Sequence, residues 1–332
     1  MKAVHPIARN DYLILTRPIE RIMASLVGWI TLNFSGAIIY GQRRLGKSQC
    51  AEFIKRYLGD VLGYKIAVVL HCVRKHDTVR EGDFLDKMLR SLGVAPPKRG
   101  TKDQKMQLIL NRFLMLARRC PVRKVILVLD DAQRLETLHL EILMSIQNEL
   151  YQEHRVMLFT LLVGQPQLKL KREMLTAAGE KQITARLMAD EVEFVGQRSL
   201  EEFQFAFNRF DEHCFYPSRS GISFTQGLAP EAWAAGWRLA SEAEALWSEY
   251  TERREGMGLE PVEEASMQAL TTMATYIYQR YACQSGFTGL GEEQVAEVVN
   301  FAGLLQLETP ARKDATNGQD DTTAADADAQ KA

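Results

Sequence analysis

Residues 41–48 read GQRRLGKS and fit the pattern G-x-x-x-x-G-K-[ST] without deviation. They follow an apolar run at 37–40 that is typical of a β-strand, and they precede a stretch at 47–62 with apolar residues at helical spacing. A glycine-rich loop between a strand and a helix is the context in which this pattern holds nucleotide phosphates. The order of the three segments therefore predicts a phosphate-binding loop.

Each fixed position of this pattern has a chemical role. Glycines at both ends allow the backbone to curl so that successive N–H groups point at phosphates, and the start of the next helix adds its positive end. The lysine neutralises the β and γ phosphates, and the serine hydroxyl is a ligand for Mg²⁺. We expect ATP and Mg²⁺ to bind at Gly41, Gln42, Arg43, Arg44, Leu45, Gly46, Lys47, Ser48 and Gln49.

Two carboxylates end a second apolar run, KVILVLDD at 124–131. Asp130 is expected to hold Mg²⁺ through its water shell, and Asp131 to polarise the attacking water. Aspartate is one methylene shorter than the glutamate that ATPases of this kind usually carry, so either the water sits closer or hydrolysis is slow. Acids often follow buried strands, and it is the phosphate loop that gives this pair a catalytic interpretation.

Apolar runs alternate with amphipathic stretches through the first two hundred residues. This alternation is typical of an α/β domain, and we expect a P-loop nucleotide-binding domain over 1–200 with a parallel sheet flanked by helices. The expected strands are 37–40, 65–71, 124–129, 156–163 and 191–195. The expected helices are 47–62, 83–92, 102–119 and 138–153.

The chain turns helical after this domain. We expect a smaller all-α lid domain over 201–307, with a loop-rich insertion near 208–230 where aromatic residues mix with Gly, Ser and Pro. Its helices are predicted at 231–254, 262–281 and 292–305. From 308 to 332 polar residues and Ala replace large apolar ones, which predicts a disordered acidic tail.

Composition narrows the class of protein. The 332 residues are 46% hydrophobic and 25% charged, as in a globular protein of two or three domains. The net charge of −1 gives no global signal for nucleic acid or membrane, but residues 314–332 carry −4, which leaves +3 on the rest. No apolar run reaches the roughly 18 residues that span a bilayer, and five widely spaced cysteines fit a reducing compartment. We expect a cytoplasmic protein with no membrane partner.

The runs GAIIYGQRRLGKS at 36–48 and LVLDDAQRL at 127–135 resemble the AAA+ ATPases that regulate transposition, of the TnsC/TniB type. A third run, LVGQPQL at 162–168, resembles the segment after the fourth core strand of this group, and the similarity spans about 16–202. Asp131 in place of Glu departs from the pattern. The resemblance implies an ATP-loaded oligomer, a ring or helical filament, on double-stranded target DNA. Such an ATPase links target-recognition proteins to a transposase and disassembles when ATP is hydrolysed.

The resemblance also implies two further catalytic residues beside Lys47 and Asp131. Gln165 follows the fourth core strand and would sense the γ-phosphate, although it could equally cap a turn before Pro166. Arg186 lies where an arginine that reaches into the adjacent subunit's site is expected. Arg172 is the competing candidate, and a solvated surface arginine is the alternative for both.

Basic residues gather in two loops of the first domain: Arg74, Lys75, Lys98, Arg99, Lys102 and Lys105. Repeated around an oligomer, such side chains would follow a DNA backbone without reading its sequence. Solvated basic loops are the alternative.

The leading hypothesis is therefore an ATP-dependent, DNA-binding regulator of transposition. Two others stay open: a secretion- or pilus-associated ATPase scaffold, and an ATP-dependent loader of replication or repair factors.

Overall fold

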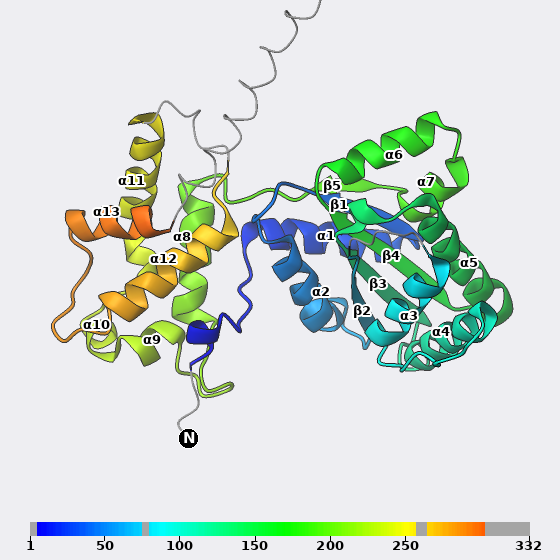
Figure 1. The fold of residues 1–332 in the computed structure, drawn as a ribbon. Helices are drawn as coiled ribbons and strands as arrows, with labels where there is room; N and C mark the ends of the chain where they lie inside the picture. The colour runs from blue at the N-terminus through cyan, green and yellow to red at the C-terminus, as the bar shows by residue number, and fades with distance from the viewer. Residues whose placement is uncertain (1–4, 75–79, 257–263, 303–332) are drawn as a thin grey trace, which may run out of the picture. The chain divides into compact units, whose positions relative to one another are not determined.

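The computed structural model describes residues 5–74, 80–256 and 264–302 (Figure 1). Within these residues the chain divides into two compact units. One is Tyr12–Gln197, and the other contains the described residues of Met1–Asp11 and Arg198–Ala332. Residues 5–11 thus pack with the helical unit, whereas the sequence placed them in the first domain. The tail predicted over 308–332 lies outside the described residues.

A five-stranded parallel sheet forms the centre of the first unit, in the order β2-β3-β4-β1-β5. The α/β fold class with a parallel core is confirmed, and all five predicted strands are present. Their bounds are β1 Gly36–Tyr40, β2 Ala67–Cys72, β3 Lys124–Asp130, β4 Met157–Gly164 and β5 Glu191–Glu193.

Helices cover both faces of this sheet, because alternate strand residues point to opposite sides and both sides are apolar. In β3, Ile126 and Val128 belong to one buried cluster with the first two helices, while Val125, Leu127 and Leu129 belong to a second cluster with the helices between residues 81 and 187. Figure 1 shows α2 on one side of the sheet and α4 and α5 on the other. The helix bounds are α1 Arg17–Thr31, α2 Lys47–Leu62, α3 Glu81–Ser91, α4 Lys102–Ala117, α5 Thr137–His154, α6 Gln167–Ala177 and α7 Lys181–Leu187.

The register of the central strands brings three chain segments to one edge of the sheet. Tyr40, the last residue of β1, pairs with Gly164, the last residue of β4. Leu129 in β3 pairs with Leu162 in β4. Because parallel strands all point the same way, the residues that follow β1, β3 and β4 meet at this edge, where ligands of open α/β sheets bind.

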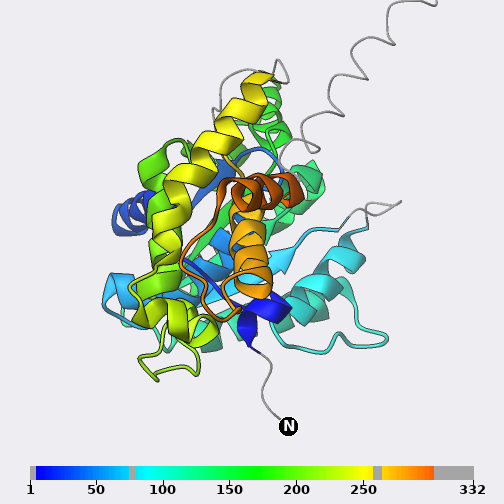
Figure 2. The ribbon, with the colours of Figure 1, turned by 90° about the vertical axis from the view of Figure 1, so that its left-hand side faces the viewer.

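The second unit is helical, as predicted (Figure 2). No helix in the described part of the chain is both long and apolar enough to cross a membrane. The helix bounds are α8 Leu200–Glu212, α9 Phe224–Leu228, α10 Pro230–Ala234, α11 Ala243–Gly256, α12 Met267–Arg280 and α13 Glu292–Phe301.

Two predictions for this unit are wrong in detail. The loop expected near 208–230 is helical up to Glu212, because Phe210 and the carboxylate of Asp211 are needed in the core. The helix expected over 231–254 is interrupted after Ala234, where Gly236 adopts φ +96°. Glycine takes this left-handed conformation at no steric cost, so the chain turns there instead of continuing as a helix.

Asp211 organises the interior of the helical unit. It is only 3% exposed and accepts hydrogen bonds from the Thr225 hydroxyl at 2.5 Å and from the N–H groups of Leu239 and Ala240 at 3.0 and 2.9 Å. Three donors offset the cost of burying a carboxylate. The side chain therefore joins α8 to α9 and to the short 3-10 turn Leu239–Glu242.

A buried histidine predicts how the first unit responds to acid. His71 in β2 is 3% exposed, with Nδ1 2.9 Å from the Ser91 hydroxyl. Burial, followed by the nearby Lys87 and His139, lowers its pKa from 6.5 to about 4. The unfolded chain therefore binds a proton before the folded chain does. Between pH 6.5 and 4 this single group should remove about 3 kcal/mol from the free energy of unfolding.

Urea unfolding of the wild type and of His71→Gln at pH 7 and pH 4.5 tests this. The variant should lose less stability on acidification than the wild type, whatever its stability at pH 7. His213→Gln, a change at an exposed histidine, is the control and should leave the acid response unaltered. Equal acid responses of the wild type and His71→Gln would show that His71 does not titrate as its burial indicates.

Candidate nucleotide-binding site

The first glycine of the loop is required by close packing. Gly41 continues from β1 and its N–H donates to the carbonyl oxygen of Gly164 at 3.2 Å. A Cβ atom at Gly41 would lie 2.2 Å from the carbonyl oxygen of Phe194, which is backbone and cannot move aside cheaply. The loop therefore leaves the sheet between β4 and the segment after β5, and only glycine fits there.

The rest of the loop is curled, and the buried side chain of Leu45 anchors it in the apolar core. Arg44 and Gly46 have left-handed φ values of 66° and 110°, and Leu45 between them is buried in the cluster under α1 and α2. In the described chain no side chain caps the amino end of α2 at Gly46. The first N–H groups of a helix need acceptors, so this end is suited to phosphate oxygens.

Lys47 curls back over the loop. Its Nζ donates to the carbonyl oxygens of Gly41 at 2.8 Å and Gln42 at 2.5 Å. The ammonium group is therefore held directly above the curl, where the β and γ phosphates of a bound nucleotide would lie.

Ser48 and Asp130 come together although 82 residues separate them. The Ser48 hydroxyl donates to Oδ2 of Asp130 at 2.7 Å. Two adjacent oxygen ligands suit Mg²⁺, which takes one or two protein ligands and fills its other positions with phosphate oxygens and water. In the described residues no three His, Cys, Asp or Glu side chains cluster as a metal site. The Ser48 hydroxyl and the Asp130 carboxylate are two oxygen ligands of the kind that Mg²⁺ accepts.

Asp131 stands beside this pair in a left-handed turn with φ 58°. Its N–H donates to Oδ1 of Asp130 at 3.0 Å, which couples the two acids through the backbone. Its own Oδ1 accepts from Nε2 of Gln133 at 3.0 Å, and its Oδ2 lies 3.6 Å from Arg134. The carboxylate is half-buried and faces the same edge as the loop.

Gln165 connects the loop to these acids. Its Oε1 accepts from Nε of Arg43 at 2.8 Å, and its N–H donates to Oε1 of Gln133 at 3.1 Å. The structure therefore gathers Arg43, Lys47, Asp131 and Gln165 at one edge. The sequence predicts no role for Gln133, although this residue lies in the LVLDDAQRL run that carries the resemblance.

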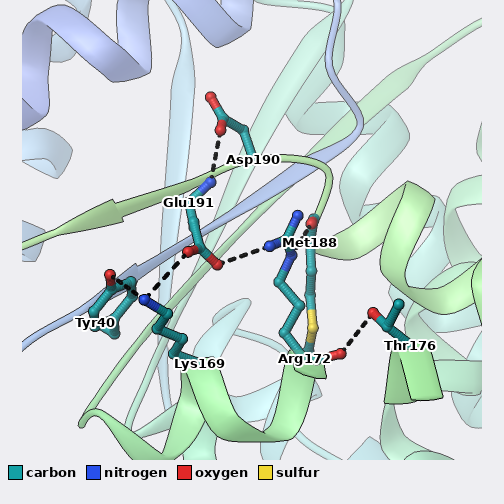
Figure 3. Close-up of polar contacts among 7 residues, drawn as sticks. All are labelled: Tyr40, Lys169, Arg172, Thr176, Met188, Asp190 and Glu191. Carbon is teal, nitrogen blue, oxygen red and sulfur yellow. Dashed lines mark hydrogen bonds and ion pairs between the residues drawn. The ribbon is translucent and has the colours of Figure 1, made fainter. Parts of the chain in front are cut away.

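Arg172 is committed to contacts within its own unit (Figure 3). Its Nη1 lies 2.8 Å from Oε2 of Glu191, and its Nε donates to the carbonyl oxygen of Met188 at 2.9 Å. Lys169, one turn earlier on α6, lies 3.8 Å from the same carboxylate and donates to the Tyr40 hydroxyl at 3.4 Å. These contacts hold α6 against β5 and against the end of β1, directly before the phosphate loop.

Arg186 lies away from the phosphate loop of its own chain. It is exposed near the end of α7 and donates to Oδ1 of Asn148 on α5. Its carbonyl oxygen accepts from the Ser35 hydroxyl at 2.8 Å, beside the start of β1. The loop follows the other end of that strand, so Arg186 has no part in the site as one chain forms it.

The basic residues of the two loops differ in their surroundings. Arg74, Lys98 and Arg99 are exposed. Lys102 pairs with Glu81, and Lys105 lies 2.8 Å from Asp86, so both join α4 to α3. Lys75 lies outside the described residues.

Residues 35–171 match the model of the AAA domain family. The matched segment contains the phosphate loop, both acids and Gln165. It does not distinguish transposition regulators from other proteins with this domain. No curated protein matches the sequence.

Solved structures similar to this chain include proteins of Aeropyrum pernix and Pyrobaculum aerophilum. The ORC2 protein of Aeropyrum pernix, in ADPNP–ADP complexes, is 14% identical, with 90% of this chain and 71% of that chain covered and a TM-score of 0.48. The ORC1 protein of the same organism in complex with DNA is 16% identical, with 88% and 84% covered and a TM-score of 0.42. Cdc6p of Pyrobaculum aerophilum is 14% identical, with 87% and 73% covered and a TM-score of 0.44.

Removal of the Lys47 ammonium tests the site directly. Lys47→Ala should weaken Mg·ATP binding at least about a hundredfold, because charge-assisted bonds to two phosphates are lost together. Isothermal titration calorimetry measures the affinity, and thermal unfolding without nucleotide checks that the fold is kept. Lys55→Ala, at an exposed lysine on the same helix, is the matched control and should bind normally. Equal ATP affinity in Lys47→Ala and the wild type would contradict the assignment.

Proposed function

We propose that this chain is an ATPase whose AAA domain binds Mg·ATP at residues 41–49 and hydrolyses it slowly. The observation that carries the proposal is the contact between the Ser48 hydroxyl and Asp130 at 2.7 Å, beneath a phosphate loop with an uncapped helix start. A loop alone would bind an anion. A loop joined to a pair of acids can also bind the metal and position water.

Each residue at the edge has a proposed task. Lys47 and the N–H groups of the loop bind and orient the triphosphate, and Ser48 and Asp130 hold the metal, which when bound supplies positive charge to the phosphates. Asp131 orients and polarises the attacking water as a general base. Gln165, whose side chain accepts a hydrogen bond from Arg43, is the proposed contact to the γ-phosphate.

Slow hydrolysis is proposed from the acid itself. The aspartate side chain is one methylene shorter than the glutamate that ATPases of this kind usually carry, so its carboxylate reaches less far toward the attacking water. Slow ATP hydrolysis suits a role in timing the disassembly better than continuous mechanical work.

We propose further that the ATP-bound protein assembles with itself, as a ring or helical filament, on double-stranded DNA and regulates transposition. In this proposal it links target-recognition proteins to a transposase and disassembles on hydrolysis. The similarity of the two motifs to the TnsC/TniB type supports this function. Arg186 is the proposed contact to the site of a neighbouring subunit, since it is exposed and away from its own loop.

All five cysteines are free thiols, which supports the proposed cytoplasmic location.

The proposed DNA surface consists of Arg74, Lys98 and Arg99, with Lys75 as a further candidate. Lys102 and Lys105 are proposed to support it by joining α3 and α4 through their ion pairs. Contacts to phosphates alone give binding that is independent of sequence and falls steeply with salt.

Asp131→Asn tests the assignment of the base. Hydrolysis should fall by about a hundredfold or more, because the general base is lost, while ATP affinity is kept. Single-turnover hydrolysis and calorimetric titration separate the two effects. Asp60→Asn, at an exposed carboxylate on α2, is the control. Normal turnover by Asp131→Asn would exclude Asp131 as the base.

The paired change Lys98→Glu and Arg99→Glu tests the DNA surface. With a non-hydrolysable ATP analogue, duplex DNA affinity should drop and the slope of log K against log salt should fall by about two, one for each lost phosphate contact. ATP affinity should not change. Lys181→Glu, at an exposed lysine on α7, is the control. Unaltered DNA affinity in the paired variant would place the DNA elsewhere, and no DNA binding by the wild type would contradict the DNA-dependent part of the proposal.

A further inference from the structure

The side-chain amide of Gln133 lies between the proposed base and the strand end that carries Gln165. Its Nε2 donates to Oδ1 of Asp131 at 3.0 Å, and its Oε1 accepts from the N–H of Gln165 at 3.1 Å. Gln133 itself is half-buried on the short 3-10 turn Ala132–Arg134 that follows β3. One planar amide thus bonds through its nitrogen to Asp131, two residues before Gln133, and through its oxygen to Gln165, 32 residues after Gln133.

The chemistry of the partners allows only one orientation of this amide. A carboxylate accepts hydrogen bonds and a backbone N–H donates them. If the amide were turned over, its oxygen would face the carboxylate of Asp131 and its NH₂ group would face the N–H of Gln165. Both contacts would then be repulsive, so Asp131 and Gln165 together hold Gln133 in one rotamer, and Gln133 in turn holds Asp131.

The surroundings of Gln133 are built to receive it. A Cβ atom at Gly164 would lie 2.6 Å from its Oε1, so the glycine at the end of β4 leaves the space that the amide occupies. Lys171 on α6 donates to the carbonyl oxygen of Gln133 at 3.0 Å and to that of Leu135. These contacts hold both the backbone and the side chain of Gln133.

The amide also completes a polar connection from the phosphate loop to the base. Arg43 in the loop donates to the side chain of Gln165 at 2.8 Å, the N–H of Gln165 donates to Gln133, and Gln133 donates to Asp131. A nucleotide that draws Arg43 or Gln165 toward its γ-phosphate therefore acts on the amide that aims the carboxylate.

We infer that Gln133 is a positioning residue for ATP hydrolysis: it orients the Asp131 carboxylate and ties that orientation to the Gln165 segment. The inference rests on the proposed ATPase function of the same site. Gln133 acts through its hydrogen bonds to Asp131 and Gln165, so its loss should change the rate of the chemical step and leave ATP binding intact.

The first test is Gln133→Ala, measured by single-turnover hydrolysis and by calorimetric titration with Mg·ATP. The rate should fall about tenfold to a hundredfold, the usual effect of removing a group that orients an acid or ligand, with the ATP dissociation constant unchanged. Gln107→Ala is the matched control. Gln107 also donates to a carboxylate, that of Glu149 at 3.2 Å, but on α4 and α5 away from the site.

Two further variants separate positioning from a general structural role. Gln133→Glu keeps the shape of the side chain but puts a carboxylate oxygen in place of the NH₂ donor to Asp131, so hydrolysis should slow as in Gln133→Ala while ATP binding is kept. Gly164→Ala displaces the amide without altering it and should also slow hydrolysis. Added to Gln133→Ala, where the amide is already gone, Gly164→Ala should cost little more.

The outcomes separate this inference from the function on which it rests. Wild-type turnover by Gln133→Ala or by Gln133→Glu would overturn the positioning role if Asp131→Asn is inactive. Weakened ATP binding in Gln133→Ala with an unchanged single-turnover rate would overturn it as well. If the wild type hydrolyses no ATP, it is the proposed function that fails.

Discussion

The parallel register of β1 and β3 on either side of β4 is the constraint on which the site depends. Tyr40 is level with Gly164, and β3 ends at the same edge with Asp130. The loop after β1 and the acids after β3 therefore meet across β4, and Gln165 lies between them. A slip of one residue would turn the buried side chains of β4 to the wrong faces of the sheet, so the apolar clusters on both faces protect this register.

Close packing at this edge limits which residues it accepts. Gly41 passes so near to the Phe194 carbonyl that no side chain fits, and Gly164 leaves the room that the amide of Gln133 fills. The second contact involves the end of a flexible side chain, so a methyl group there would move the amide and spare the backbone. The first glycine shapes the loop, and the second shapes the polar connection behind it.

Local signals explain what the sequence predicted correctly. The helix expected over 47–62 coincides with α2, because the phosphate-loop pattern marks its start and helical spacing marks its extent. The loop expected near 208–230 is present over 213–222, but the prediction was wrong for 208–212, because Phe210 and Asp211 are buried in the core of the helical unit. Their burial depends on partners on other helices that local pattern does not show.

The difference between local and long-range contacts also explains which parts of the site could be predicted from the sequence. The loop and the two acids each form a contiguous run, so they were visible in the sequence. The bond of Gln133 to the Gln165 N–H and the ion pair of Lys105 with Asp86 join residues far apart in the chain. Such contacts form only when the strands and helices have packed, so the spacing of residues in the sequence does not predict them.

A crystal structure of the protein with Mg²⁺ and a non-hydrolysable ATP analogue tests the central claim most directly. The account predicts the triphosphate in the curl of 41–48, with Lys47 at its β and γ phosphates and the metal beside Ser48 and Asp130. A nucleotide bound elsewhere, or a loop that stays without phosphate at saturating analogue, would contradict it.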